Sequence, residues 1–283
     1  MGELSGRTVV VTGATSGIGL AASVALAALG PELVLVGRDR ARLEAAVAAV
    51  KARAPGAQVA ALRADLSSLA EVRALAGELL ARHPHLHVLV NNAGGVSARR
   101  EVTPDGLERT FAVNHLAPYL LTRLLLDRLR ASAPARIVNV ASIAHRNAAL
   151  DFDDLQLTRD YAVMRAYGRS KLANVLFTRE LARRLAGTGV TVNSLHPGAV
   201  ATRIWSRAPW LFRPLLAVAK RFMLTPEQGA ATLVHLAASA EVERLTGAYF
   251  EGGRAVDPSA AARDEAAARR LWEESARLVG LDP

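Results

Sequence analysis

Short apolar runs alternate with helical stretches of ten or more residues along most of the chain. A short apolar run between longer amphipathic segments predicts a buried parallel strand that a crossover helix joins to the next strand. The alternation predicts an α/β fold: one domain over 1–283, with a doubly wound parallel sheet of about seven strands and helices on both faces. The expected strands lie at 8–11, 33–36, 59–62, 88–90, 137–140, 190–195 and 247–251, and a terminal helix at about 258–279.

A glycine-rich turn with Gly13, Gly17 and Gly19 directly follows the first expected strand. Glycines let the backbone turn sharply and approach a pyrophosphate, whose charge the next helix N-terminus favours. A tight turn without a ligand is the alternative, because the spacing departs from the commoner G-x-G-x-x-G pattern. Ligands of doubly wound sheets bind beyond the carboxyl ends of the strands, which is where this turn is expected.

Tyr167 and Lys171 lie four residues apart in an expected helix, so both side chains can point into one cleft. A free tyrosine has a pKa of about 10 and is a poor acid or base at neutral pH. A cation beside the phenol stabilises the phenolate and is expected to lower that pKa. Tyr161 has Arg165 at the same spacing, but a guanidinium stays protonated and cannot relay a proton.

Further motifs accompany this pair in a recognisable order: Asn91-Asn92-Ala93-Gly94, then Asn114, then Ser142. Together with the glycine-rich turn they resemble the short-chain dehydrogenase/reductase family in its single-domain form, over about 7–253. The segments around Ser142 and Lys171 are similar to the retinol-dehydrogenase-like branch, which also includes the WW-domain oxidoreductases and the protochlorophyllide reductases. The resemblance implies a Rossmann-type fold.

The resemblance also implies the chemistry, an interconversion of an alcohol and a carbonyl by hydride transfer with a nicotinamide. Tyr167 would exchange a proton with the carbonyl oxygen, and Lys171 would hold down the pKa of the phenol and bind the nicotinamide ribose. Ser142 would orient the carbonyl. Asn114 would bind a water in a proton relay with Lys171.

The same resemblance implies a set of cofactor-binding residues at the carboxyl ends of several strands. Asn91 is interpreted instead as a structural tie between neighbouring strands. The implied cofactor residues are Gly13, Thr15, Ser16, Gly17, Ile18, Gly19, Arg38, Asp65, Leu66, Asn92, Ala93, Gly94, Tyr167, Lys171, Pro197, Gly198, Val200 and Thr202.

The choice between the two nicotinamide dinucleotides depends on the end of the second strand. An acid there would bind the ribose 2′-hydroxyl of NAD. Arg38 follows Gly37 instead and can pair with the 2′-phosphate of NADP. Asp39 is expected to cap the next helix, so NADP(H) is predicted. Asp65 either binds the adenine or is a loop acid near a helix start.

Asn114 lies within an expected helix at about 104–129. Pro118 has no N–H, so the carbonyl of residue 114 loses its partner in the helix. The sequence therefore predicts a kinked helix whose open carbonyl at Asn114 binds an ordered water.

The segment at about 200–226 is expected to form a lid over the site, and it is rich in apolar residues such as Trp205 and Phe212. An apolar lid predicts a lipophilic ketone, aldehyde or alcohol as the small-molecule substrate. An ordinary amphipathic helix packed on the body is the alternative. Other open functions are a double-bond reduction like that of protochlorophyllide reductases, and a non-catalytic NADP(H)-binding sensor or interaction module.

The net charge of +9 comes from Lys and Arg interleaved with Asp and Glu, and aromatic residues make up 5% of the chain. This pattern predicts a basic solvated surface, with no nucleic-acid partner. The absence of cysteine excludes disulfides and thiolate metal ligands, and no metal site is expected. We expect a cytoplasmic protein with no transmembrane segment, although weak membrane-surface contact and a homo-oligomer stay open.

Overall fold

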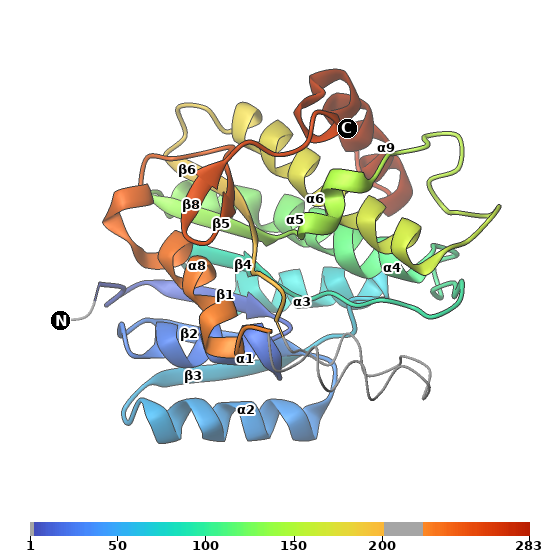
Figure 1. Cartoon of the computed structure of the whole chain (residues 1–283). Coiled ribbons are helices and arrows are strands. Elements are labelled where there is room, and N and C mark those ends of the chain that lie inside the picture. The colour runs from blue at the N-terminus through green and yellow to red at the C-terminus, as the bar shows by residue number, and fades with distance from the viewer. Residues whose placement is uncertain (1–2, 201–222) are drawn as a thin grey trace.

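The computed structural model describes residues 3–200 and 223–283 and contains one eight-stranded sheet in the order β3-β2-β1-β4-β5-β6-β7-β8. All neighbouring strands are parallel except β7 and β8 (Figure 1). The predicted doubly wound parallel sheet is confirmed. The strands are β1 (Thr8–Thr12), β2 (Glu32–Gly37), β3 (Gln58–Arg63), β4 (Val88–Asn91), β5 (Ala135–Val140), β6 (Val190–His196), β7 (Tyr249–Glu251) and β8 (Arg254–Val256).

The eighth strand was not expected from the sequence. β8 pairs antiparallel with β7 at the edge of the sheet, with Phe250 opposite Ala255. All three residues of β8 are exposed. An edge strand without a buried side has no apolar run to reveal it, which is why the hydrophobic pattern indicated seven strands.

Helices cover both faces of the sheet because the strand side chains alternate between two cores. Val10 and Val34 belong to one core, whereas Val9 and Val11 belong to the other. The first core is covered by α3 (Leu69–Arg82), α5 (Ala117–Ala131), α6 (Val163–Arg184) and α9 (Glu265–Val279). The second is covered by α1 (Gly17–Ala27), α2 (Arg40–Arg53) and α8 (Pro226–Ala238).

Two helix starts behave largely as their sequences predict. Asp39 caps α2 by accepting a hydrogen bond from the Arg42 N–H at 2.9 Å. Ser68 caps α3 by accepting from the Glu71 N–H at 3.3 Å. The Glu71 carboxylate accepts from the Asp65 N–H at 2.9 Å. Glu71 therefore ties the end of β3 to the first turn of α3.

The terminal helix is shorter than predicted. A short 3-10 turn, Ala261–Arg263, precedes α9, which begins at Glu265. Asp264 is the N-cap and accepts from the Ala267 N–H at 3.0 Å, so the cap residue and not Pro258 marks the start. Other short turns are α4 (Arg109–Phe111), a π-helical turn (Ala112–Leu116) and 3-10 turns at Ile143–Asn147 and Ala240–Val242.

Candidate active site

The glycine-rich turn brings its backbone against neighbouring backbone at the carboxyl end of β1. Gly13 has φ +66°, and a Cβ there would lie 2.8 Å from the Cα of Ala93. A Cβ on Gly19 would collide with the Gly13 carbonyl. No described side chain caps the N-terminus of α1, whose N-cap is Ser16. The turn therefore lies directly before helix N–H groups that no described side chain caps, and such groups suit a phosphate.

The side chain of Asn92 locks this turn from the end of β4. Its amide donates to the carbonyls of Thr12 at 2.8 Å and Gly13 at 3.2 Å. The Thr12 hydroxyl in turn accepts from the N–H groups of Asn92 and Ala93. A cofactor contact by Asn92 or Ala93 stays a prediction, and the Asn92 amide has a structural role that the sequence did not reveal.

The ends of β2 and β3 meet beside the turn. A Cβ on Gly37 would lie 2.6 Å from the Thr15 side chain, so Gly37 makes room for Thr15. Arg38 is exposed. Burial opposes ionisation of Asp65, but hydrogen bonds from Ser67 and the charge of Arg38 outweigh it and lower the Asp65 pKa. Arg38 and an ionised Asp65 thus lie near each other where the adenosine half of a dinucleotide is expected.

The end of β6 closes the other side of the turn. A Cβ on Gly229 in α8 would meet the side chain of Val200, the carbonyl of Pro197 at 3.3 Å and the side chain of Ile18 at 3.4 Å. These expected cofactor residues therefore come together although the sequence separates them widely. Gly198 has φ +86° and packs against Leu224. Thr202 lies outside the described residues.

Asn91 is a structural tie, as predicted. Its amide donates to the Thr122 hydroxyl at 3.0 Å and to the Asn139 side chain at 2.8 Å. Asn139 donates in turn to the Thr178 hydroxyl at 2.9 Å. This buried chain of hydrogen bonds joins β4 and β5 to α5 and α6, and it fixes the sheet beneath the site.

Lys171 projects from α6 to the end of β5. Its ammonium donates to the Val140 carbonyl at 2.9 Å and lies 5.7 Å from the centroid of the Tyr167 ring. The side chain is 3% exposed, and burial lowers its pKa to about 8. The expected helical pair is therefore present, and burial brings the titration of its lysine closer to neutral pH.

Tyr167 is held on the Ser142 side of the same cleft. Burial raises the pKa of Tyr167, and a hydrogen bond with the Ser142 side chain acts in the opposite direction. The pKa was expected to be lowered by Lys171, and this expectation is wrong for the structure, because desolvation of the phenolate is the dominant effect. Ser142 is buried and also caps the 3-10 turn by accepting from the Ala144 N–H at 3.2 Å.

The helix that carries Asn114 changes its form at Asn114. The structure has α4, a π-helical turn at Ala112–Leu116 and then α5, where the sequence predicted one kinked helix at about 104–129. The Ala117 N–H bonds to the Ala112 carbonyl, five residues back. The helix begins at Arg109 because Glu108, with its N-cap side chain, precedes it. The departure from a straight α-helix is confirmed, and the water on the Asn114 carbonyl stays a prediction.

The Asn114 side chain is fully engaged with protein. Its amide donates to the Gly95 carbonyl and to the Ser170 hydroxyl, each at 2.9 Å. Its oxygen accepts from the Gly95 N–H at 2.8 Å. A Cβ on Gly94 would lie 3.2 Å from that oxygen and 3.5 Å from the Lys171 ammonium. Gly94, Asn114 and Lys171 are thus brought together, as the motif order implied.

Sequence reasoning missed two polar residues that support the site. Ser170 links Asn114 to the Tyr167 carbonyl, to which its hydroxyl donates at 2.7 Å. His145 is buried, its Nδ1 donates to the Ser142 carbonyl at 2.7 Å, and its Nε2 accepts from the Ser259 N–H at 3.2 Å. Each lies within three residues of a catalytic candidate, and this nearness could have pointed to it. Their hydrogen-bond partners are distant in sequence, so the sequence did not reveal their roles.

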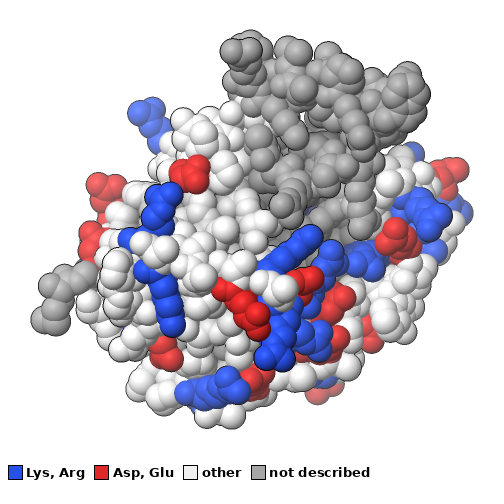
Figure 2. Space-filling model, turned by 90° about the horizontal axis from the view of Figure 1, so that it is seen from below, with Lys and Arg blue, Asp and Glu red and all other residues white. Residues whose placement is uncertain are grey.

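The expected lid at about 200–226 falls mostly outside the described residues. Its ends meet, since the Leu224 N–H donates to the Ala199 carbonyl at 2.9 Å. Within 3–200 and 223–283, no group of His, Cys, Asp or Glu could hold a metal ion. No helix in that part of the chain is long and apolar enough to cross a membrane. Basic and acidic side chains are interspersed on the face in Figure 2. Exposed Arg40 and Glu44, for example, form an ion pair at 3.1 Å.

The chain matches the model of the short chain dehydrogenase family over residues 7–209. It is 42% identical to human retinol dehydrogenase 13, over 99% of this chain and 86% of that protein. It is 44% identical to mouse retinol dehydrogenase 14, over 99% of this chain and 88% of that protein.

Solved structures agree with these relatives. A putative uncharacterised protein from Mycobacterium paratuberculosis has a TM-score of 0.80 at 32% identity, covering 98% of this chain and 95% of that chain. An NADPH-bound short chain oxidoreductase from Pseudomonas aeruginosa PAO1 has a TM-score of 0.70 at 28% identity, covering 91% of this chain and 100% of that chain. The chain belongs to the short-chain dehydrogenase/reductase family, in its retinol-dehydrogenase-like branch.

Proposed function

We propose that this protein is an NADP(H)-dependent oxidoreductase that interconverts a lipophilic ketone or aldehyde and its alcohol. The observation that carries the proposal is the meeting of a phenol, an ammonium and a hydroxyl beside the glycine-lined edge of the sheet. These groups belong to Tyr167, Lys171 and Ser142, and the ammonium lies 5.7 Å from the phenol ring. This set of groups suits proton transfer to a carbonyl oxygen and not merely nucleotide binding.

The residues at this edge fit a nicotinamide dinucleotide. The backbone of the turn leaves no room for a Cβ on Gly13 or Gly19, so only glycine allows the tight turn that would bring the start of α1 to a pyrophosphate. The unpaired N–H groups of α1 would bind the phosphates, and exposed Arg38 would pair with a 2′-phosphate. The NADPH-bound relative from Pseudomonas aeruginosa supports the same preference.

The chain's own residues would move the proton. Bound NADPH supplies the hydride for carbonyl reduction. Tyr167 donates its phenolic proton to the carbonyl oxygen, and the Ser142 hydroxyl orients that oxygen by a hydrogen bond. The raised pKa of Tyr167 keeps the phenol protonated at neutral pH until transfer, and the charge of Lys171 then stabilises the phenolate. Because the Asn114 side chain is fully bonded, its backbone carbonyl is the group that would hold the water of a proton relay.

Apolar side chains beside the catalytic groups support a lipophilic substrate. Ile143 follows Ser142 directly and is 50% exposed. Met164 lies one helical turn before Tyr167 and is 54% exposed. Large exposed apolar residues at a catalytic cleft suit the burial of an apolar ligand.

The proposal is tested by measuring oxidation of NADPH and NADH side by side against ketones and aldehydes of increasing chain length. We expect turnover with NADPH, with kcat/KM rising with chain length. Tyr167→Phe should reduce kcat by about a hundredfold or more, as expected for loss of a general acid, with little change in NADPH affinity. Unchanged turnover in Tyr167→Phe would contradict the mechanism, and NADPH binding without turnover of any carbonyl would favour a sensor.

A further inference from the structure

An arginine lies in the middle of the catalytic motif and points away from the catalytic cleft. Arg169 is two residues from both Tyr167 and Lys171, so on a helix its side chain leaves the opposite face of α6. It is 2% exposed, and its guanidinium lies 5.0 Å from the centroid of the Phe111 ring. A buried cation at this position requires a compensating partner.

That partner is Glu108, which is also completely buried. A carboxylate oxygen of Glu108 lies 3.4 Å from Nη2 of Arg169. The same carboxylate accepts hydrogen bonds from the N–H groups of Thr110 at 2.7 Å and Phe111 at 2.9 Å. Glu108 therefore fixes the start of α4, which leads directly into the π-helical turn of Asn114.

The pair also holds a third segment, the loop before α6. Nη1 of Arg169 donates to the Asp154 carbonyl at 3.1 Å. The Gln156 side chain accepts from the Glu108 N–H at 2.7 Å. The pair thus joins three stretches of chain that the sequence keeps apart, one of which carries Tyr167 and Lys171.

The π-helical turn meets α6 through the Asn114 amide, which donates to the Ser170 hydroxyl at 2.9 Å, and through the His115 ring, which packs edge-on against Phe177. The Arg169–Glu108 pair joins α6 to the start of α4, which leads into that turn. We propose that Arg169 and Glu108 are positioning residues that set the register of the π-helical turn against Tyr167 and Lys171. This inference rests on the proposed function, because it concerns the same proton-transferring groups.

Buried ion pairs contribute little net stability, since desolvation of both charges offsets their attraction. The directional hydrogen bonds of a buried ion pair can instead fix how two secondary-structure elements are placed against each other. A misplacement of about 1 Å at reacting groups can reduce the rate by about a hundredfold. Loss of the pair is therefore expected to affect the rate of the chemical step more than cofactor binding, since the described hydrogen bonds of both side chains go to Asp154, Thr110, Phe111 and each other.

The test compares Arg169→Gln, Arg169→Lys and the doubly neutral Glu108→Gln/Arg169→Gln with the wild type. The double variant keeps both sites polar and avoids a lone buried charge, in case Arg169→Gln folds poorly. Arg183→Gln is the matched control, because it removes a partner of buried Glu180 on the same helix, remote from the cleft. The measurements are kcat, KM, the NADPH dissociation constant, the thermal midpoint and hydrogen exchange of the peptide spanning 108–118.

We expect kcat to fall about tenfold to a hundredfold in Arg169→Gln and in the double variant, with NADPH affinity within about threefold of the wild type. Exchange of the 108–118 peptide should be faster in both. Arg169→Lys should recover part of kcat, because an ammonium can still pair with Glu108. Arg183→Gln should keep the wild-type kcat and the wild-type exchange of that peptide.

A lowered thermal midpoint with unchanged kcat in both Arg169→Gln and the double variant would overturn the inference and leave only a structural role. Unchanged exchange of the 108–118 peptide would also overturn it. Failure of the wild type to turn over any carbonyl would instead contradict the proposed function, and the exchange measurement would still report whether the pair holds the π-helical turn.

Discussion

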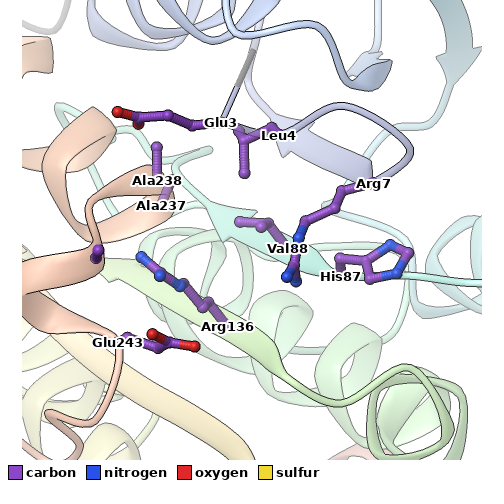
Figure 3. A pocket seen from close by; sticks show the side chains of 10 residues that line it. Glu3, Leu4, Arg7, His87, Val88, Arg136, Ala237, Ala238 and Glu243 are labelled. Carbon is purple, nitrogen blue, oxygen red and sulfur yellow. The ribbon is translucent and has the colours of Figure 1, made fainter. Parts of the chain in front are cut away.

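The two edges of the sheet use polar groups in opposite ways. At the amino edge, a hollow is lined by Arg7, His87, Arg136 and Glu243 (Figure 3). The guanidinium groups there donate hydrogen bonds to backbone carbonyls. Arg136 donates to the Ser239 carbonyl at 2.8 Å and Arg7 to the Pro134 carbonyl at 2.9 Å. These arginines tie the starts of β1 and β5 to the neighbouring loops.

At the carboxyl edge, the side chains of Ser142, Tyr167 and Lys171 lie close together. The Lys171 ammonium donates to the Val140 carbonyl, and the Ser142 hydroxyl accepts from the Ala144 N–H and also bonds with Tyr167. The amino edge of the sheet therefore uses its charges for stability, whereas the carboxyl edge collects the candidate catalytic groups. Substitutions at the carboxyl edge should therefore change activity, and substitutions at the amino edge should change stability.

The largest expected effect is that of Lys171→Met at the carboxyl edge. The variant removes the charge that stabilises the phenolate, so kcat should fall by about a hundredfold to ten-thousandfold. Steady-state kinetics with NADPH and a responsive ketone would measure it, with circular dichroism to show that the variant is folded. A kcat within threefold of the wild type would remove Lys171 from the mechanism.

A smaller effect is expected for Gly19→Ala in the cofactor cradle. The added methyl would collide with the Gly13 carbonyl, and overpacking of this kind costs about 1–3 kcal/mol. NADPH affinity should fall about tenfold to a hundredfold in a fluorescence titration, whereas kcat at saturating NADPH should change less. Gly77→Ala is the matched control, because a Cβ at Gly77 meets nothing within 4 Å.

Arg38→Ser should lower NADPH affinity about tenfold, since an exposed charge-assisted hydrogen bond contributes about 1.5 kcal/mol. NADH lacks the 2′-phosphate, so its affinity should stay the same. The ratio of the two dissociation constants is the measurement. An equal loss for both cofactors would mean that Arg38 does not recognise the 2′-phosphate.

The pH dependence of reduction distinguishes Lys171 from Tyr167. Burial lowers the pKa of Lys171 to about 8, so the lysine loses its charge as the pH rises through that value and kcat should fall about tenfold per unit above it. Burial raises the pKa of Tyr167, so control by the phenol alone would move the midpoint upward from the ordinary tyrosine range and away from that of Lys171. Lys171→Arg should abolish the limb near pH 8.

The smallest effect on activity is expected at the amino edge. Arg136→Gln removes hydrogen bonds to the Ser239 and Leu236 carbonyls, so the free energy of unfolding should fall by about 2 kcal/mol. The kcat of the folded variant should equal that of the wild type. A change in kcat with unchanged stability would refute the separation of the two edges.

The sequence alone determined the layers of the sheet, the turn after β1 and the pairing of Tyr167 with Lys171. All of these depend on spacings of a few residues, namely the alternation of apolar runs, glycines at a strand end and one helical turn. The eighth strand was not predicted, because an exposed edge strand has no run of apolar residues. Only the tertiary structure decided which side chains support the candidate catalytic residues through hydrogen bonds and ion pairs. His145 to Ser259 and Glu108 to Arg169 are contacts between segments far apart in the chain. The pKa of Tyr167 was also decided there, because burial depends on the surrounding fold and not on the neighbouring lysine alone.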